Sequence, residues 1–68
     1  MYANIGKFII DKLIETQWYD SIDEIKAETV NALSNLKYDM ENGDTLWEAF
    51  DKACRDLHIT TDNIESYM

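Results

Sequence analysis

The chain has 68 residues, of which 14 are Asp or Glu and six are Lys or Arg, so its formal net charge is −8. This length accommodates one domain, and a hydrophobic content of 46% is too high for a disordered acidic tail. The negative charge disfavours direct binding to nucleic acid or to an anionic membrane, and it favours a basic protein surface as partner.

Neither a disulfide nor a membrane segment is expected. Cys54 is the single cysteine, which excludes an internal disulfide and fits a reducing compartment. The apolar run Phe8-Ile9-Ile10 is followed at once by Asp11, so it is too short for a signal peptide or for the roughly 20 apolar residues of a membrane span. We therefore expect a cytoplasmic protein, which for a virus-encoded chain means the host cytoplasm.

The first predicted helix runs from about residue 2 to residue 16 and carries two adjoining apolar rows. The first row consists of Ile5, Phe8, Ile9 and Leu13. Ile10 and Ile14 form the second row beside it. Because the two rows together cover well over half of the helix perimeter, we expect this helix either to lie centrally between neighbours or to offer Ile10 and Ile14 to another chain.

The second predicted helix covers residues 22–41, and both of its ends carry sequence signals. Ser21 and Glu24 have the spacing of a capping box. Gly43 follows the last helical residues and can adopt the left-handed conformation that ends a helix. The stripe expected to face the core consists of Ile22, Ile25, Thr29, Val30, Leu33, Leu36 and Met40.

The third predicted helix covers residues 45–58. Thr45 and Glu48 form a second candidate capping box, with Asp44 as the rival N-cap residue. The short connection makes the second and third helices antiparallel neighbours, and residues 62–67 could add a short fourth C-terminal turn that brings Ile64 and Tyr67 back to the core. The sequence therefore predicts an all-α fold, a small three-helix bundle that forms a single domain over residues 1–68.

Excess negative charge gathers on the second helix and at its two ends. The outward side of this helix carries a row of acidic and amide residues at helical spacing, namely Glu24, Glu28, Asn31, Asn35 and Asp39. Such a row could imitate the phosphates of a nucleic acid backbone, or bind a basic groove by charge and hydrogen bonding. The alternative is a solvated helix face that only keeps the protein soluble.

Four aromatic residues lie outside the predicted apolar stripes or at their edges. Trp18 and Tyr19 fall in the first loop beside Asp20, and Tyr38 projects away from the stripe of the second helix. Trp47 borders the apolar stripe of the third helix, which consists of Leu46, Phe50, Ala53, Cys54 and Leu57. The simpler interpretation makes Trp18 and Trp47 lids that close the two ends of the core. The alternative makes some of these residues anchors for a partner, since Trp and Tyr dominate binding hot spots.

No catalytic, cofactor-binding or metal-binding site is expected. Cys54 and His58 lie four residues apart, which would place them on one helix face, but a cysteine on an apolar stripe is ordinarily a buried, inert thiol. Two potential ligands do not make a structural zinc site. A loose calcium-loop pattern around residues 39–44 has Asp44 where that loop requires glycine. We therefore expect a protein that is not an enzyme.

The leading hypothesis is a non-enzymatic regulator or inhibitor that occupies a basic, nucleic-acid-binding surface of a target protein. The residues predicted to bind this partner are Asp20, Asp23, Glu24, Glu28 and Asp39, with Trp18, Tyr19 and Tyr38 as aromatic anchors. In size, charge and helicity the chain resembles the small acidic helical proteins that phages and mobile elements encode to block host factors, among them nucleic-acid mimics and anti-CRISPR proteins. That resemblance implies an inhibitor, and it assigns no role to individual residues.

A second hypothesis assigns the binding role to apolar surface instead of to charge. In that case Ile10 and Ile14 form the interface of a homodimer or of a larger complex, and the chain is a structural or regulatory subunit. The acidic residues would then only maintain solubility.

Overall fold

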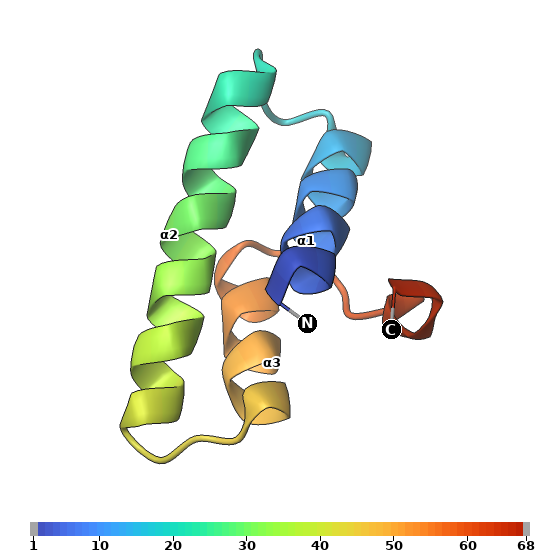
Figure 1. Ribbon diagram of the computed structural model, residues 1–68. Coiled ribbons are helices and arrows are strands. Elements are labelled where there is room, and N and C mark those ends of the chain that lie inside the picture. Colours follow the sequence, from blue (N-terminus) through green and yellow to red (C-terminus); the bar gives the residue numbers. More distant parts are fainter. Residues whose placement is uncertain (1, 68) are drawn as a thin grey trace.

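The computed structural model describes residues 2–67, with side chains from Asn4 onwards, as three α-helices followed by one short 3-10 helix (Figure 1). The elements are α1 (Tyr2–Thr16), α2 (Ile22–Glu41), α3 (Leu46–Asp56) and η1 (Ile64–Tyr67). This part of the chain contains no strand, so the predicted all-α three-helix bundle is confirmed. None of the described helices has the length and apolar content needed to cross a membrane.

Local hydrogen bonds at both ends of α2 explain its length. At the start, the Ser21 hydroxyl accepts a hydrogen bond from the Glu24 amide at 3.3 Å. At the end, Gly43 has a φ of 109°, and its amide donates to the Met40 carbonyl at 3.2 Å while the next amide donates to Asp39 at 3.0 Å. These two bonds form the Schellman motif that terminates helices, for which glycine is the preferred residue.

A complete capping box starts α3. The Thr45 hydroxyl accepts from the Glu48 amide at 3.2 Å, and the Glu48 carboxylate accepts from the Thr45 amide at 2.9 Å. Asp44, the rival candidate, instead pairs with Lys52 at 2.6 Å. Glu48 and Lys52 are four residues apart, which favours an ion pair on a helix. They form none in the structure, because the Glu48 carboxylate accepts the Thr45 amide and Lys52 pairs with Asp44.

The third helix ends at Asp56, two residues earlier than the sequence predicts. His58 adopts a left-handed φ of 59°, and its amide donates to the Arg55 carbonyl at 3.0 Å. The Ile59 amide donates to the Cys54 carbonyl, also at 3.0 Å. This is again a Schellman motif, and Ile59 packs against the core just after it. The sequence gives a weak signal for this stop because His58 occupies the position where glycine is usual.

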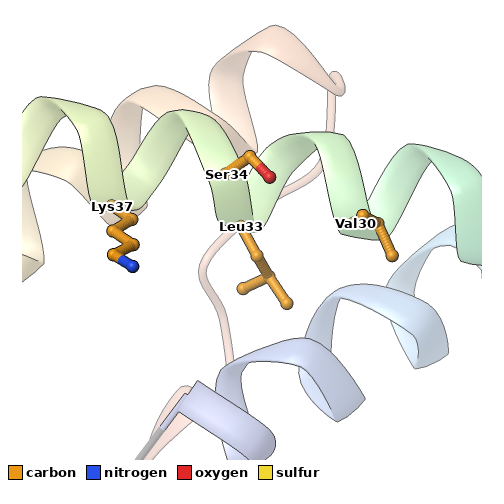
Figure 2. Close-up of a pocket in the computed structure, with 4 residues that line it drawn as sticks. All are labelled: Val30, Leu33, Ser34 and Lys37. Atoms are coloured by element: carbon orange, nitrogen blue, oxygen red, sulfur yellow. The ribbon is translucent and has the colours of Figure 1, made fainter.

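α1 and α3 both pack against α2, and η1 returns to α1 (Figure 1). α1 approaches α2 tightly at Gly6, where a Cβ atom would lie 3.3 Å from Leu33 Cδ1. Figure 2 shows Leu33 extending from α2 toward α1. A glycine inside a helix costs about 1 kcal/mol relative to alanine, and the tight contact with Leu33 explains its use at this position.

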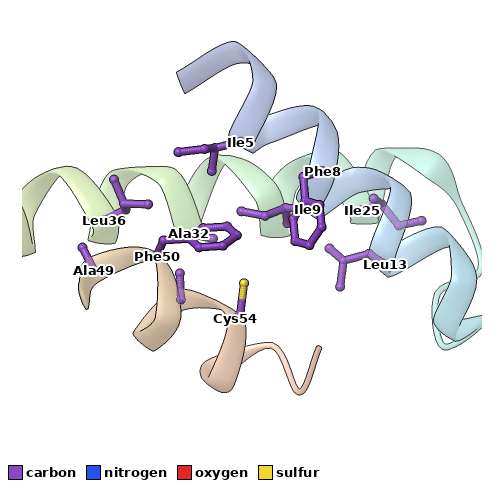
Figure 3. Close-up of a cluster of buried hydrophobic side chains, with 11 residues drawn as sticks. Ile5, Phe8, Ile9, Leu13, Ile25, Ala32, Leu36, Ala49, Phe50 and Cys54 are labelled. Atoms are coloured by element: carbon purple, nitrogen blue, oxygen red, sulfur yellow. The ribbon is translucent and has the colours of Figure 1, made fainter. Parts of the chain in front are cut away.

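The hydrophobic core lies between the three helices (Figure 3). Its fully buried large side chains are Phe8, Phe50, Ile5, Ile9, Leu13, Leu36 and Cys54. The Phe8 ring meets the Phe50 ring at 5.5 Å and the Tyr67 ring at 5.3 Å, both in tilted or edge-on geometry. The Tyr67 hydroxyl donates to the Asp11 carboxylate at 2.5 Å, so η1 is attached to α1 by both an aromatic contact and a hydrogen bond.

The buried face of α2 is rotated relative to the predicted stripe. Val30, predicted to face the core, is 61% exposed, and Ile22 is also largely exposed. Ala32, which the predicted stripe omitted, is only 6% exposed. Ala32 and Ala53 line the same depression at the junction of α2 and α3. The buried face of α2, which consists of Ile25, Thr29, Ala32 and Leu36, is thus turned further toward α3 than the predicted stripe.

Candidate protein-binding surface

The acidic and amide row of α2 borders α3. Glu28, Asn31 and Asn35 line an open depression at the α2–α3 junction together with Asp56 of α3. Glu24 lies one helical turn before Glu28, and Asp39 one turn after Asn35. The acidic face, as we name it, consists of Glu24, Glu28, Asn31, Asn35, Asp39 and Asp56. Asp56 is not among the residues predicted to bind a partner. The i,i+4 spacing of Asp51 and Arg55 and the capping-box position of Glu48 leave Asp56 as the acidic residue of α3 without an expected partner.

Tyr19 packs at the N-terminal end of this face. Its side chain is partly buried against the core, and this burial raises the pKa of its hydroxyl above the ordinary value. The nearby carboxylates of Glu28 and Glu24 raise the Tyr19 pKa further, in that order. The structure thus brings together three of the predicted partner-binding residues, and Tyr19 stays a neutral hydrogen-bonding group at physiological pH.

No ion pair between described residues involves the acidic face, although Lys52 lies near its C-terminal end, close to Asp39. Lys12 pairs with Glu15 at 3.9 Å, Lys52 with Asp44 at 2.6 Å, and Arg55 with Asp51 at 2.6 Å. The other three of the six basic residues, Lys7, Lys26 and Lys37, form no ion pair with any residue that the structure describes. Because Glu24, Glu28 and Asp56 likewise have no ionic partner within residues 2–67, their charges are uncompensated.

The remaining predicted carboxylates do not all join this face. Asp39 lies at the C-terminal end of the face. The hydrogen bond and the charge of Asp44 raise the pKa of Lys52, and the charge of Asp39 raises it further. Asp20 lies in the first loop and lines a different depression. Asp23 is seven residues, or about two turns, from Val30, so it lies on the same side of α2 as Val30 and not on the side of the acidic face. Sequence spacing alone could have separated Asp23 from the row.

Of the predicted aromatic anchors, Trp18 and Tyr38 are exposed and lie on different elements, whereas Tyr19 is partly buried. Tyr38 is 66% exposed and borders the acidic face, since it is three residues from Asn35 on the same helix. Trp18 lines a depression with Lys12 and the chain segment that follows α3. The interpretation of the tryptophans as lids is not supported by their exposure: Trp18 is 60% and Trp47 51% exposed. Trp47 has an edge-on ring contact with Phe50 of the core.

Ile10 and Ile14, the predicted oligomer interface, differ in exposure. Ile10 is partly buried and packs against the core, whereas Ile14 is 48% exposed. Ile14 lines a depression with Ile22 at the end of α1. Only part of the second apolar row is therefore accessible.

Cys54 and His58 do not form a reactive pair. Because α3 ends at Asp56, His58 lies beyond the helix in a left-handed conformation and leaves the face that Cys54 occupies. Burial raises the pKa of the Cys54 thiol to about 11, with a further contribution from Asp51 and an opposing one from Lys12. The thiol therefore stays protonated at neutral pH, which makes it a poor nucleophile. Within residues 2–67, no group of three His, Cys, Asp or Glu side chains is placed to hold a metal ion.

The acidic face offers carboxylates as acceptors for Lys or Arg, and amides that both donate and accept. Uncompensated carboxylates on one side of a small domain also produce a negative potential that accelerates encounter with a basic surface. The chemistry available at this face is thus recognition of cationic groups. Comparison of the chain with protein-family models, with curated proteins and with solved structures finds no match.

Proposed function

We propose that this chain is a non-enzymatic protein-binding module whose acidic face docks on a basic surface of a partner protein. The observation that carries this proposal is the separation of charge. Three cations are held in ion pairs by carboxylates that do not belong to the acidic face, including Lys52, which lies near Asp39 but pairs with Asp44. The other three lie on α1 or on the side of α2 that carries Val30. A helix face that served solubility alone would gain nothing from such separation, since mixed charges also keep proteins soluble.

The arrangement of the acidic face fits a groove lined by Lys and Arg. Glu24, Glu28, Asn31 and Asn35 present one carboxylate or amide about every 4.5 to 6 Å along α2, because they are three or four residues apart and a helix rises about 1.5 Å per residue. Asp56 adds a carboxylate from α3. A regular row of this kind supports a partner whose basic site binds nucleic acid, where the module acts as an inhibitor by occupying that site.

The test compares two triple variants with the same net charge. Glu24→Gln/Glu28→Gln/Asp56→Asn neutralises the acidic face, and Glu41→Gln/Asp62→Asn/Glu65→Gln neutralises three exposed carboxylates outside it. Each variant and the wild-type chain are immobilised and exposed to cytosolic extract at about 50 mM and about 500 mM salt. The wild type and the second triple should retain the same basic protein at low salt and release it at high salt.

The acidic-face triple should retain little of that protein at either salt concentration. An oligonucleotide added to the low-salt complex should displace the captured protein if its nucleic-acid-binding site is the one occupied. Equal retention by both triples would contradict the proposal, because it would show that total charge, or another surface, governs binding.

A further inference from the structure

The α1–α2 junction carries an apolar surface that the chain itself leaves uncovered. Val30 and Leu33 line a depression there with Ser34 and Lys37, and Figure 2 shows Val30, Leu33 and Lys37 extending toward the side of α1. Leu33 Cδ1 lies 3.3 Å from the position of a Cβ atom at Gly6, so α1 contacts α2 beside this depression. The α1–α2 groove, as we name it, begins at this point.

The groove continues toward the loop between the two helices. Ile14 and Ile22 line the adjacent depression, and both remain close to half exposed, at 48% and 46%. Ile10 lies one turn before Ile14 on the same side of α1 and is partly buried against the core. An apolar strip therefore follows most of the length of α1 along α2.

Three lysines border this strip. Lys7 is seven residues from Ile14 and shares its side of α1. Lys26 and Lys37 flank Val30 at four and seven residues along α2, again on one side of the helix. All three lysines are exposed, and they are the three that form no ion pair with a described residue.

The uncompensated positive charge of this acidic chain is thus concentrated along one apolar groove. Of the neighbouring carboxylates, Asp20 lines the depression at the loop end, Asp23 lies near the N-terminal end of α2, and Glu41 lies beyond Lys37 at its C-terminal end. Asp11, between Lys7 and Ile14 along α1, accepts the hydrogen bond of the Tyr67 hydroxyl. Along the middle of the groove, the charged groups that form neither an ion pair nor a hydrogen bond with a described residue are therefore the lysines. An occupant that complements the groove must supply apolar side chains along its centre and negative charges along its edges.

We propose that the α1–α2 groove binds one amphipathic helix of a partner protein, with apolar residues spaced three and four apart and Asp or Glu on its flanks. Helix-in-groove recognition uses this spacing. The groove follows α2 from Ile22 to Lys37, about 22 Å at 1.5 Å per residue, which matches a helix of about four turns. A second copy of the chain complements the groove poorly, because a two-fold contact would place the same lysine-bordered surface against itself.

The probe for this proposal is a displayed library of helical peptides about four turns long, selected against the full chain. Enriched peptides should carry apolar residues at helical spacing with Asp or Glu beside them. A synthetic peptide of the enriched sequence should shift the backbone amide resonances of Lys7, Val30 and Lys37 more than those of Glu28 and Asp56.

Matched variants then test the role of the lysines. Lys7→Gln/Lys26→Gln/Lys37→Gln should bind the synthetic peptide about tenfold more weakly, whereas Lys12→Gln/Lys52→Gln/Arg55→Gln, which has the same net charge, should change binding by less than about twofold. Val30→Asp should also weaken binding. Neutralising Glu24, Glu28 and Asp56 should leave peptide binding unchanged, so this inference and the proposed function can fail separately.

Several outcomes would overturn the inference. Selection that enriches basic peptides or none, resonance shifts centred on the acidic face, or equal losses in the two lysine triples would each do so. Sedimentation that shows a dimer of the chain, dissociated by Ile14→Asp, would assign the groove to a second copy instead.

Discussion

One substitution made at two positions tests the observed orientation of α2. Val30→Asp and Ala32→Asp introduce the same carboxylate two residues apart, so both variants have the same formal net charge, one unit more negative than the wild type. They differ in where the carboxylate lies, because residues two apart on a helix point in nearly opposite directions. Val30 is 61% exposed and Ala32 6%.

The expected losses of stability differ severalfold. Full burial of a valine side chain contributes about 1.5 kcal/mol, and Val30 has only about two fifths of its surface buried, so Val30→Asp should lower the free energy of unfolding by about 0.6 kcal/mol. A carboxylate at Ala32 would lie at the α2–α3 junction without a cation, which costs about 3 kcal/mol or more. Since a domain of this length has a total stability of about 3 to 10 kcal/mol, Ala32→Asp should largely unfold it.

Urea unfolding followed by far-ultraviolet circular dichroism measures both losses. If Val30→Asp destabilises the chain as much as Ala32→Asp, the buried face of α2 is the one that the apolar pattern alone predicts, and the orientation described above is wrong. The measurement also bears on the α1–α2 groove, because Val30 must be accessible for a partner helix to contact it.

Three further predictions concern single interactions. Thr45→Ala removes the cap of α3 and should lower the free energy of unfolding by about 1 kcal/mol in the same assay, with Thr45→Ser as a control that keeps most of it. The raised Cys54 pKa means that the unfolded chain releases the thiol proton near pH 9 and the native chain near pH 11; stability should therefore fall by about 2 to 3 kcal/mol as pH rises through this window, and Cys54→Ala should remove that share of the pH dependence. Tyr67→Phe removes the hydroxyl whose pKa is raised by its hydrogen bond to Asp11, so the mean tyrosine titration midpoint, measured by ultraviolet absorbance, should move to lower pH; no change in the midpoint would contradict that bond.

The fold could be predicted to the extent that local signals determine it. Ser21, Gly43 and Thr45 act within a few residues of themselves, through caps and a left-handed stop, and the structure shows the hydrogen bonds that their positions imply. The end of α3 was predicted too late because His58 takes a left-handed conformation that glycine ordinarily supplies. The turn at His58 is accompanied by the packing of Ile59 on the core, a tertiary contact that local sequence signals do not predict.

The candidate site could be predicted only in part, for a similar reason. Helical spacing correctly places Glu24 and Glu28 on one side of α2, because that relation lies within a single helix. The addition of Asp56 requires knowledge of how α3 packs on α2. The lysine-bordered groove was not foreseen, since it depends on which cations find carboxylates in the folded chain, and Lys52 pairs with Asp44 and not with the residue that sequence spacing favours.

The salt dependence of affinity for the captured partner tests the central claim most directly. The dissociation constant of the wild-type complex should rise steeply between about 50 mM and about 500 mM salt, because screening weakens attraction between exposed charges. The Glu24→Gln/Glu28→Gln/Asp56→Asn complex should show a much shallower rise from an already weak affinity. An equal wild-type dissociation constant at both salt concentrations would contradict a partner bound through the acidic face.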